Sequence, residues 1–453
     1  MSSVLPTPRQ LRLQQMEFYA FVHFTVNTFT DKEWGDGTED PAIFNPTNFC
    51  ADQWVDAIKA AGMTGLILTC KHHDGFCLWP SKLTSHSVAA SPFRGGKGDV
   101  VSEVADACRK QGIRFGVYLS PWDRNCPLYG SGKAYDDYFI GQLTELLSEY
   151  GDIFCVWFDG ACGEGPNGKK QHYDWERYYS VIRKLQPDAT IHVCGPDIRW
   201  CGNEAGNTRP AEWSVVPKRT ADTEKIASAS QQCDNSEFRL RTISAGDQDL
   251  GSREILKGET ELIWYPAEVN TSIRPGWFYH ASEDDSVKPL EQLIEIYEKS
   301  VGGNATFLLN IPPTPEGLFH KNDVARLHQI GQYITNSYAC NLAEGACFSD
   351  PSAICLCRDD DTIYSPKPEI RLHWHEPQTI RRIVLKEQIS LGQRVEAFCV
   401  ETLINGIWQD VANGTVIGHK KILNLPPVAT QDLRICITDS RCEPLLRFIA
   451  IYA

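Results

Sequence analysis

Short apolar runs alternate with amphipathic stretches over the first three quarters of the chain. Apolar runs bounded by turn residues predict buried strands, and apolar residues spaced three or four apart predict helices. The predicted strands are 18–24, 65–70, 113–120, 153–161, 190–194, 261–269 and 305–311. The predicted helices are 48–62, 100–111, 135–150, 175–185, 290–301 and 324–336. Residues 8–15 are a polar lead-in, and residues 197–253 are a long irregular loop of the kind that active sites use.

Strands that alternate with helices in this way predict a parallel sheet with right-handed crossovers. We favour a (β/α)8-like barrel of the TIM type, with irregularity allowed, over an open doubly wound sheet. An open sheet usually carries a Gly-rich phosphate loop after its first strand, and none follows residue 24. Polar residues also stand at the ends of many predicted strands, which suits one central mouth: His23, His72, His73, Tyr118, Asp159 and Glu268.

The periodicity changes after residue 340, where apolar and polar residues alternate in short runs separated by Gly, Pro and Asn. The runs are 370–374, 380–385, 394–401, 406–411 and 432–437. This alternation is typical of antiparallel strands with one face packed inward, and it predicts a β-sandwich. The chain therefore divides into a barrel over residues 1–339 and a C-terminal β-sandwich over residues 340–453.

The strand predicted at 153–161 carries one carboxylate near its end, Asp159, which Gly160 follows. A buried carboxylate is costly unless it is paired or used. Because the active sites of (β/α) barrels lie at the carboxyl ends of the strands, Asp159 is a candidate catalytic residue. The alternative is that Asp159 only caps the next helix.

Composition limits the classes of partner and the cellular compartments that we expect for the protein. The net charge of −14 argues against nucleic acid or an anionic membrane surface as a partner. The 17 cysteines show no C-x-x-C spacing, and Cys70, Cys155, Cys194, Cys399 and Cys436 fall inside apolar runs. We therefore expect reduced, structural thiols and no zinc site. Without an apolar leader the sequence indicates a cytoplasmic protein, or a periplasmic or secreted one whose leader was removed.

Several segments carry a resemblance to a known family. They are Phe-Val-His-Phe at 21–24, Lys-His-His-Asp-Gly-Phe at 71–76, Gly-Val-Tyr at 116–118, Val-Trp-Phe-Asp-Gly at 156–160, Ser-Ile-Arg-Pro-Gly-Trp at 272–277 and Leu-Asn-Ile-Pro-Pro at 309–313. In order and spacing they resemble glycoside hydrolase family 29, the α-L-fucosidases. The segment 392–395 and Trp408 resemble the discoidin-type sandwich that many members carry.

The resemblance implies a retaining glycosidase with Asp159 as nucleophile, a second carboxyl group as general acid/base, and no cofactor. The segment 200–206, with Asn203-Glu204-Ala205-Gly206, resembles that of the subgroup acting on branched α-1,3/1,4-linked fucose. It implies Glu204 as the acid/base, with Glu212 and Glu164 as fallback candidates. The alternative is that Glu204 is a solvated loop residue.

The resemblance also implies that His23, His72 and His73 contact fucose hydroxyl groups. The alternatives are core packing and, because of the His-His-Asp triplet, a metal site. A catalytic metal centre usually needs a third protein ligand and an open position, so we predict no metal there. Trp157 lies two residues before Asp159 and is expected to pack on the sugar. The remaining expected wall residues, each with a scaffold role as its alternative, are Glu33, Trp34, Tyr118, Glu268 and Trp277.

The predicted function is that of an exo-α-L-fucosidase that releases terminal α-1,3/1,4-linked L-fucose from oligosaccharides or glycoconjugates by double displacement. The alternatives are a broad-specificity fucosidase, a transfucosidase and, in a different class, a non-catalytic fucose-binding protein. The C-terminal sandwich either binds glycan or supports the barrel. No calcium motif stands in its loops, Asp359-Asp360-Asp361 being the nearest, and the sequence does not predict an oligomeric state.

Overall fold

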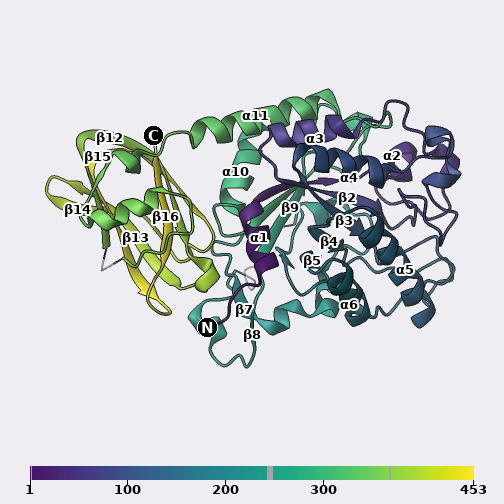
Figure 1. Cartoon of the computed structure of the whole chain (residues 1–453), viewed down its shortest axis with the longest axis horizontal. Coiled ribbons are helices and arrows are strands. Elements are labelled where there is room, and N and C mark those ends of the chain that lie inside the picture. Colours follow the sequence, from purple (N-terminus) through teal and green to yellow (C-terminus); the bar gives the residue numbers. More distant parts are fainter. Residues whose placement is uncertain (2, 242–247, 367–368) are drawn as a thin grey trace.

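The computed structural model describes residues 1, 3–241, 248–366 and 369–453. Eight parallel strands form one sheet in the order β5-β4-β3-β2-β1-β10-β9-β6. The strands are β1 (Phe18–Val22), β2 (Gly65–Lys71), β3 (Arg114–Leu119), β4 (Cys155–Phe158), β5 (Thr190–Val193), β6 (Arg199–Trp200), β9 (Ala267–Ser272) and β10 (Thr306–Asn310). A single bridge between His192 and Ile198 links the two outer strands, so the barrel is nearly closed. The predicted (β/α)8-like barrel is confirmed (Figure 1).

Helices follow most of the strands. The longer helices are α3 (Ala51–Ala60), α4 (Val100–Gln111), α5 (Lys133–Glu149), α6 (Trp175–Leu185), α10 (Leu290–Ser300) and α11 (Lys321–Ser337). Helix α4 illustrates their boundaries: the Asp99 carboxylate accepts from the Ser102 N–H at the start, and Gly112 ends the helix at a φ of 74°. The short helices are α2 (Val26–Thr30) and the 3-10 turns η1 (Pro41–Ile43), η2 (Val88–Ala90), η3 (Phe93–Gly95), η4 (Lys218–Ala221), η6 (Ala281–Glu283), η7 (Leu342–Gly345), η8 (Pro351–Cys357) and η9 (Ile389–Leu391).

The lead-in expected at 8–15 is a helix, α1 (Pro8–Met16), which contacts β5 and β10. Thr7 and Gln10 form a capping box around Pro8 at the first position, a start signal that the polar composition obscured. Its side chains also make long-range contacts, since Trp264 Nε1 donates to Gln14 Oε1 over 3.0 Å. No helix among the described residues is both long enough and apolar enough to cross a bilayer.

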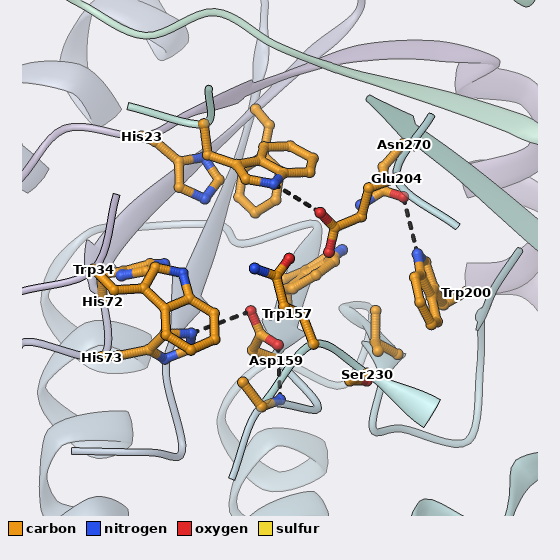
Figure 2. Close-up of a pocket in the computed structure, with 15 residues that line it drawn as sticks. His23, Trp34, His72, His73, Trp157, Asp159, Trp200, Glu204, Ser230 and Asn270 are labelled. Atoms are coloured by element: carbon orange, nitrogen blue, oxygen red, sulfur yellow. Dashed lines mark hydrogen bonds and ion pairs between the residues drawn. The ribbon is translucent and has the colours of Figure 1, made fainter. Parts of the chain in front are cut away.

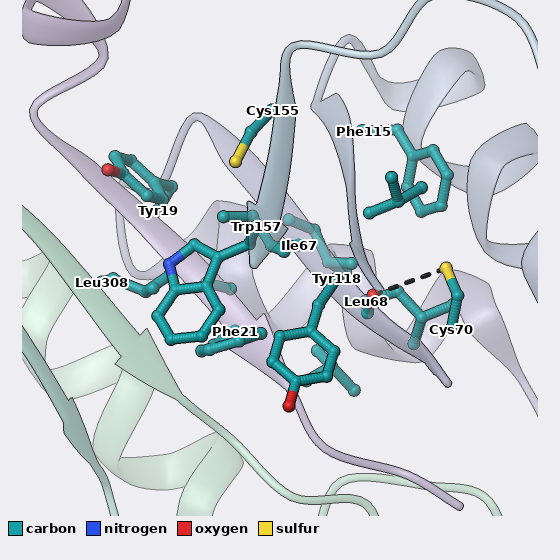
Figure 3. Close-up of a cluster of buried hydrophobic side chains, with 14 of the residues drawn as sticks. Tyr19, Phe21, Ile67, Leu68, Cys70, Phe115, Tyr118, Cys155, Trp157 and Leu308 are labelled. Atoms are coloured by element: carbon teal, nitrogen blue, oxygen red, sulfur yellow. Dashed lines mark hydrogen bonds between the residues drawn. The ribbon is translucent and has the colours of Figure 1, made fainter. Parts of the chain in front are cut away.

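Large aromatic side chains fill the barrel beside and beneath the pocket. Phe21, Tyr118 and Trp157 come from three different strands and are nearly or fully buried. Figure 3 shows the three rings side by side. Their ring centroids lie 5.1–5.7 Å apart. Burying one such side chain stabilises the fold by about 1.5–3 kcal/mol. The same packing fixes the ends of these strands, where the polar residues of the pocket begin.

The chain departs from the regular pattern between β5 and β9. The strands β5 and β6 are joined directly by 194–198, without a helix, and the two-residue β6 lies in what the sequence predicted as an irregular loop. Residues 201–266 then hold β7 (Val215–Pro217), α7 (Thr223–Ala229), α8 (Ser236–Arg239), α9 (Arg253–Leu256) and β8 (Leu262–Trp264). The single strand predicted at 261–269 is wrong: β8 pairs antiparallel with β7, and after Pro266 the chain enters barrel strand β9.

The C-terminal region is an antiparallel sheet folded on itself. Its strands are β11 (Cys347–Phe348), β12 (Glu369–Glu387), β13 (Val395–Ile404), β14 (Ile407–Gly414), β15 (Lys421–Ser440) and β16 (Leu446–Tyr452). The long strands β12 and β15 shift register between His373 and Gln378, where Pro377 removes a ladder donor. The first half of β12 pairs with β11, and the second half pairs with β16. Side chains from both halves, such as Leu372 and Ile383, share one core, so the predicted sandwich is confirmed.

Candidate active site

A pocket with about 560 Å³ of empty space opens at the carboxyl ends of the barrel strands. Its aromatic walls are Phe21, Trp34, Trp157, Trp200 and Trp277. Its polar side chains are His23, His72, His73, Asp159, Glu204, Ser230, Gln231 and Asn270. Figure 2 shows Asp159 and Glu204 entering it from different sides. Aromatic walls with a few placed polar groups are typical of a site for one sugar ring.

Asp159 directly follows β4, and donors hold its carboxylate from two sides. The Ala161 N–H donates to Oδ1 over 2.9 Å, and the Tyr118 hydroxyl donates to Oδ2 over 3.0 Å. The side chain keeps 25% of its surface exposed, toward the pocket that it lines. Asp159 is therefore a fixed carboxylate with open access to a bound sugar, as a nucleophile requires.

Glu204 lies four residues after β6, on a turn that its neighbour shapes. The side chain of Asn203 accepts from the N–H groups of Ala205 and Asn207, and Gly206 takes a φ of 83°. Trp277 Nε1 donates to Glu204 Oε2 over 2.9 Å. Burial raises the pKa of Glu204 to about 7, and the negative charge of Asp159 adds to the rise. Near neutral pH this carboxyl group exchanges its proton readily.

His73 has a tautomer that the hydrogen bonds around it determine. Ser120 Oγ donates its proton to the Trp122 carbonyl, so the 2.7 Å contact between Ser120 Oγ and His73 Nδ1 requires a proton on Nδ1. Burial lowers the pKa of His73 to about 4, so the ring is neutral at pH 7. Nε2 is then an acceptor, 3.8 Å from Asp159 Oδ2. A sugar hydroxyl between them can donate to this nitrogen.

Hydrogen bonds also determine the tautomer of His23, which directly follows β1. The Asn310 amide donates to Ser272 Oγ and the Trp277 carbonyl, which leaves Asn310 Oδ1 to accept from His23 Nδ1 over 2.8 Å. Burial lowers the pKa of His23 to about 4, and burial lowers that of His72 well below its ordinary value. Within the described ranges, His72 Nδ1 is buried without a hydrogen-bond partner. The histidines thus offer uncharged polar atoms, which suit neutral hydroxyl groups.

Trp34, Trp157 and Trp277 line the pocket, but three other predicted wall residues lie behind it. Glu33 accepts from the N–H groups of Trp277 and Phe278 and thereby fixes the position of Trp277. Glu268 is fully buried and accepts from Trp157 Nε1 over 2.7 Å. Together with the bond from Tyr118 to Asp159, these contacts place Glu33, Glu268 and Tyr118 as supports of the residues that face the pocket.

Neither fallback acid lies at the pocket. Glu212 is fully buried and pairs with Arg199 Nη2 at 2.6 Å and Arg209 Nη1 at 3.3 Å. Glu164 is exposed to solvent and does not line the cavity. Ser230, Gln231 and Asn270 do line it and were not predicted. Ser230 and Gln231 follow α7 in the irregular segment 201–266 between β6 and β9. Asn270 is distinguished only by a tertiary hydrogen bond, which Trp200 Nε1 donates to its side chain over 3.0 Å.

A barrel that brings two carboxyl groups of contrasting environment into one aromatic pocket is typical of the glycoside hydrolase class. Comparison with known proteins makes the class specific. A family model described as Alpha-L-fucosidase matches residues 9–338. The chain therefore belongs to the α-L-fucosidase family, glycoside hydrolase family 29. The predicted family and the prediction of an enzyme are both confirmed.

Relatives along the whole chain agree with this assignment. Alpha-L-fucosidase 1 of Arabidopsis thaliana is 39% identical over 99% of this chain and 87% of its own. A putative alpha-L-fucosidase structure from Bacteroides ovatus is 46% identical, with a TM-score of 0.87 over 99% of this chain and 74% of that one. A family 29 fucosidase from Ruminococcus gnavus, solved in complex with fucose, is 29% identical, with a TM-score of 0.83 and coverage of 99% and 95%.

Proposed function

We propose that the protein is a retaining exo-α-L-fucosidase in which Asp159 is the nucleophile and Glu204 the general acid/base. The observation that carries the proposal is the contrast between the two acids. Asp159 is held by two donors and is open to the pocket, whereas burial and the charge of Asp159 raise the pKa of Glu204 to about 7. Pairs of carboxyl groups with such different environments divide the roles of nucleophile and proton donor.

In the first step one carboxylate oxygen of Asp159 attacks the anomeric carbon while Glu204 gives its proton to the departing glycosidic oxygen. The carbon–oxygen bond to the leaving group breaks, and a fucosyl ester with inverted configuration forms on Asp159. Trp277 Nε1 supports the step, because its hydrogen bond to Glu204 Oε2 stabilises the carboxylate that remains.

In the second step Glu204 takes a proton from water, which attacks the ester carbon and releases α-L-fucose. Esterification removes the negative charge of Asp159, one of the causes that raise the pKa of Glu204. The pKa of Glu204 therefore falls when the ester forms, as a change from acid to base requires. Hydrolysis restores the charge of Asp159 and the raised pKa, and the cycle closes.

The partner is a fucosylated glycan, and its terminal fucose fits the uncharged histidine nitrogens. His73 Nε2 and His23 Nε2 accept hydroxyl protons in the neutral rings that their Nδ1 partners select. Aromatic rings from several strands surround the pocket, which supports action on a chain end rather than within a chain.

The linkage that we propose is α-1,3/1,4 on branched glycans. Its support is the segment 200–206, which brings both Trp200 and Glu204 to the pocket. Release of fucose from a Lewis-type trisaccharide and from a simple aryl fucoside tests it. A strong preference for the trisaccharide is expected. Equal rates would indicate a broad-specificity fucosidase, and accumulated transfer products would indicate a transfucosidase.

The stereochemical course tests the mechanism separately. Proton NMR of the first product formed, recorded before the sugar mutarotates, is expected to contain α-L-fucose. β-L-Fucose as the first product would overturn the double displacement while leaving the fucosidase activity itself intact.

A further inference from the structure

The outward face of the C-terminal sheet gathers thiols and carboxylates in two neighbouring rows. The strand register aligns Glu369 of β12, Cys436 of β15 and Cys399 of β13 in one row. It aligns Arg434 of β15 and Glu401 of β13 in the next row. The alternate residues on these strands, such as Ile370, Ile435 and Val400, are buried in the sandwich core. Because side chains alternate across a strand, both rows face outward.

This placement corrects the expectation of structural thiols for two cysteines. Cys70 and Cys155 are fully buried in the barrel, as the apolar runs predicted. Cys399 and Cys436 are only partly buried and face one another across β13 and β15. Apolar packing therefore does not account for these two thiols, and carboxylates surround them.

The ligand atoms of Cys399, Glu401 and Cys436 lie close enough together to share one metal ion, and Glu369 adjoins them through Cys436. One ligand atom each from Cys399, Glu401 and Cys436 lies within 4.8 Å of the other two. Cys436 Sγ lies 3.6 Å from Glu401 Oε2 and 3.6 Å from Glu369 Oε2. Zinc bonds of about 2.3 Å to sulfur and about 2.0 Å to oxygen give tetrahedral S···O edges of about 3.5 Å.

We propose that Cys399, Cys436, Glu401 and Glu369 form a binding site for a divalent transition metal, with Zn²⁺ as the expected ion. Two thiolates favour zinc over the hard ions calcium and magnesium, which prefer oxygen ligands alone. The site lies on the C-terminal sheet, apart from the barrel pocket, so its role is structural: one ion joins β12, β13 and β15.

Arg434, in the second row, places a positive charge beside the two carboxylates of the proposed site. It donates to Glu401 Oε2 through Nε and to Glu369 Oε2 through Nη1, the same oxygens that approach Cys436. A carboxylate oxygen has a second lone pair for a metal, so Arg434 can orient both ligands. The guanidinium also stacks over Trp408, 4.5 Å from the ring centroid. Its positive charge offsets part of the four negative charges that the metal would meet.

Metal binding at this site must release protons. A metal binds cysteine as the thiolate, so each S–H proton leaves to buffer as the Zn–S bond forms. Affinity consequently increases with pH.

Titration of the full chain with Co²⁺ in the presence of a phosphine reductant tests the proposal. Thiolate-to-Co²⁺ charge-transfer absorption reports sulfur ligation, and the ligand-field bands report tetrahedral geometry. The parent protein is expected to bind one equivalent with both signals. Cys399→Ser and Cys436→Ser should lose the charge-transfer band, and Glu401→Gln should weaken binding at least tenfold. The matched control is the double variant Cys355→Ser/Cys357→Ser, which removes another thiol pair and should leave the titration unchanged. Added Zn²⁺ should displace the Co²⁺.

Retained fucosidase activity in every variant shows that each one is folded. Three results would overturn the proposal: no charge-transfer band in the reduced parent protein, a band that survives both Cys399→Ser and Cys436→Ser, or a band that depends on Cys355 and Cys357. Affinity that does not increase with pH would contradict thiolate ligation.

Discussion

Trp277 donates its indole N–H to Glu204 Oε2 over 2.9 Å, and its own backbone N–H is held by the Glu33 carboxylate at 2.8 Å. The indole bond favours the charged form of Glu204, whereas burial and Asp159 favour the neutral form. Their balance gives a pKa of about 7. The loop that follows β9 therefore sets the proton affinity of the acid that we assign to catalysis.

Trp277→Phe tests this balance. The variant removes the donor that stabilises ionised Glu204, so the pKa of Glu204 should rise. Because Glu204 must be protonated in the first step, the parent kcat/KM should fall as the pH rises through about 7. In the variant this alkaline limb should move up by about one pH unit, the equivalent of a hydrogen bond to a charged group. Trp34→Phe, at the same pocket, should lower activity without moving the limb.

Glu204→Gln should separate substrates by their leaving groups. Loss of the proton donor should slow cleavage of a natural oligosaccharide by about 10²- to 10⁴-fold. An aryl fucoside with an acidic phenol needs little protonation, so formation of the ester should be slowed much less. Added azide should then restore turnover and give α-L-fucosyl azide. Glu164→Gln, an exposed acid away from the pocket, is the matched control; an equal loss there would count against Glu204.

Asp159→Ala should abolish turnover while the fold stays intact, because no other carboxylate lines the pocket opposite Glu204 within the described part of the chain. The small side chain leaves space for an external nucleophile, so azide should attack directly and give β-L-fucosyl azide. Circular dichroism and the melting temperature check the fold. Release of fucose at the parental rate would show that the nucleophile is another residue.

Glu268→Leu should lower the melting temperature strongly. The buried carboxylate accepts from Tyr19, Trp157 and His192, and the substitution removes the acceptor that these three donors share. A loss of about 3–5 kcal/mol is expected at neutral pH. His192 and the other donors lower the pKa of Glu268 below its ordinary value of 4.5 despite its burial. Its stabilising effect is thus present above that value and lost at lower pH.

The control for this measurement is Glu261→Gln. Glu261 lies in the segment 201–266, and its side chain is 65% exposed. It should shift the melting temperature very little, since exposed ion pairs contribute about 0–1 kcal/mol. A Glu268→Leu protein as stable as the parent would mean that the buried hydrogen bonds contribute nothing net.

The sequence predicted elements that carry their own periodicity. Strand β4 is an uninterrupted apolar run, and Asp159 follows it directly, so both the strand and its candidate catalytic residue could be identified. Strand β6 has only two residues, Arg199 and Trp200, and no local pattern distinguishes it from a loop. It exists because it pairs with β9 and nearly closes the barrel.

The site could be predicted for residues beside regular strands and not for those fixed by tertiary contacts. The sequence predicted Glu33 as a wall residue of the pocket. In the structure its carboxylate is instead hydrogen-bonded to Trp277, Phe278 and His280. Nothing in the sequence distinguishes Asn270 from other strand residues. In the structure it lines the pocket and accepts a hydrogen bond from Trp200. Hydrogen bonds between segments far apart in sequence decide both cases, and spacing does not record them.

The most direct test of the central claim is to trap the covalent intermediate. A 2-deoxy-2-fluoro-L-fucosyl fluoride should inactivate the enzyme slowly, because the fluorine at C2 destabilises both transition states while fluoride still leaves. Mass spectrometry of the digested protein should then find one fucosyl label, on Asp159, with fucose protecting against it. A label on any other residue, or inactivation without covalent attachment, would contradict the account.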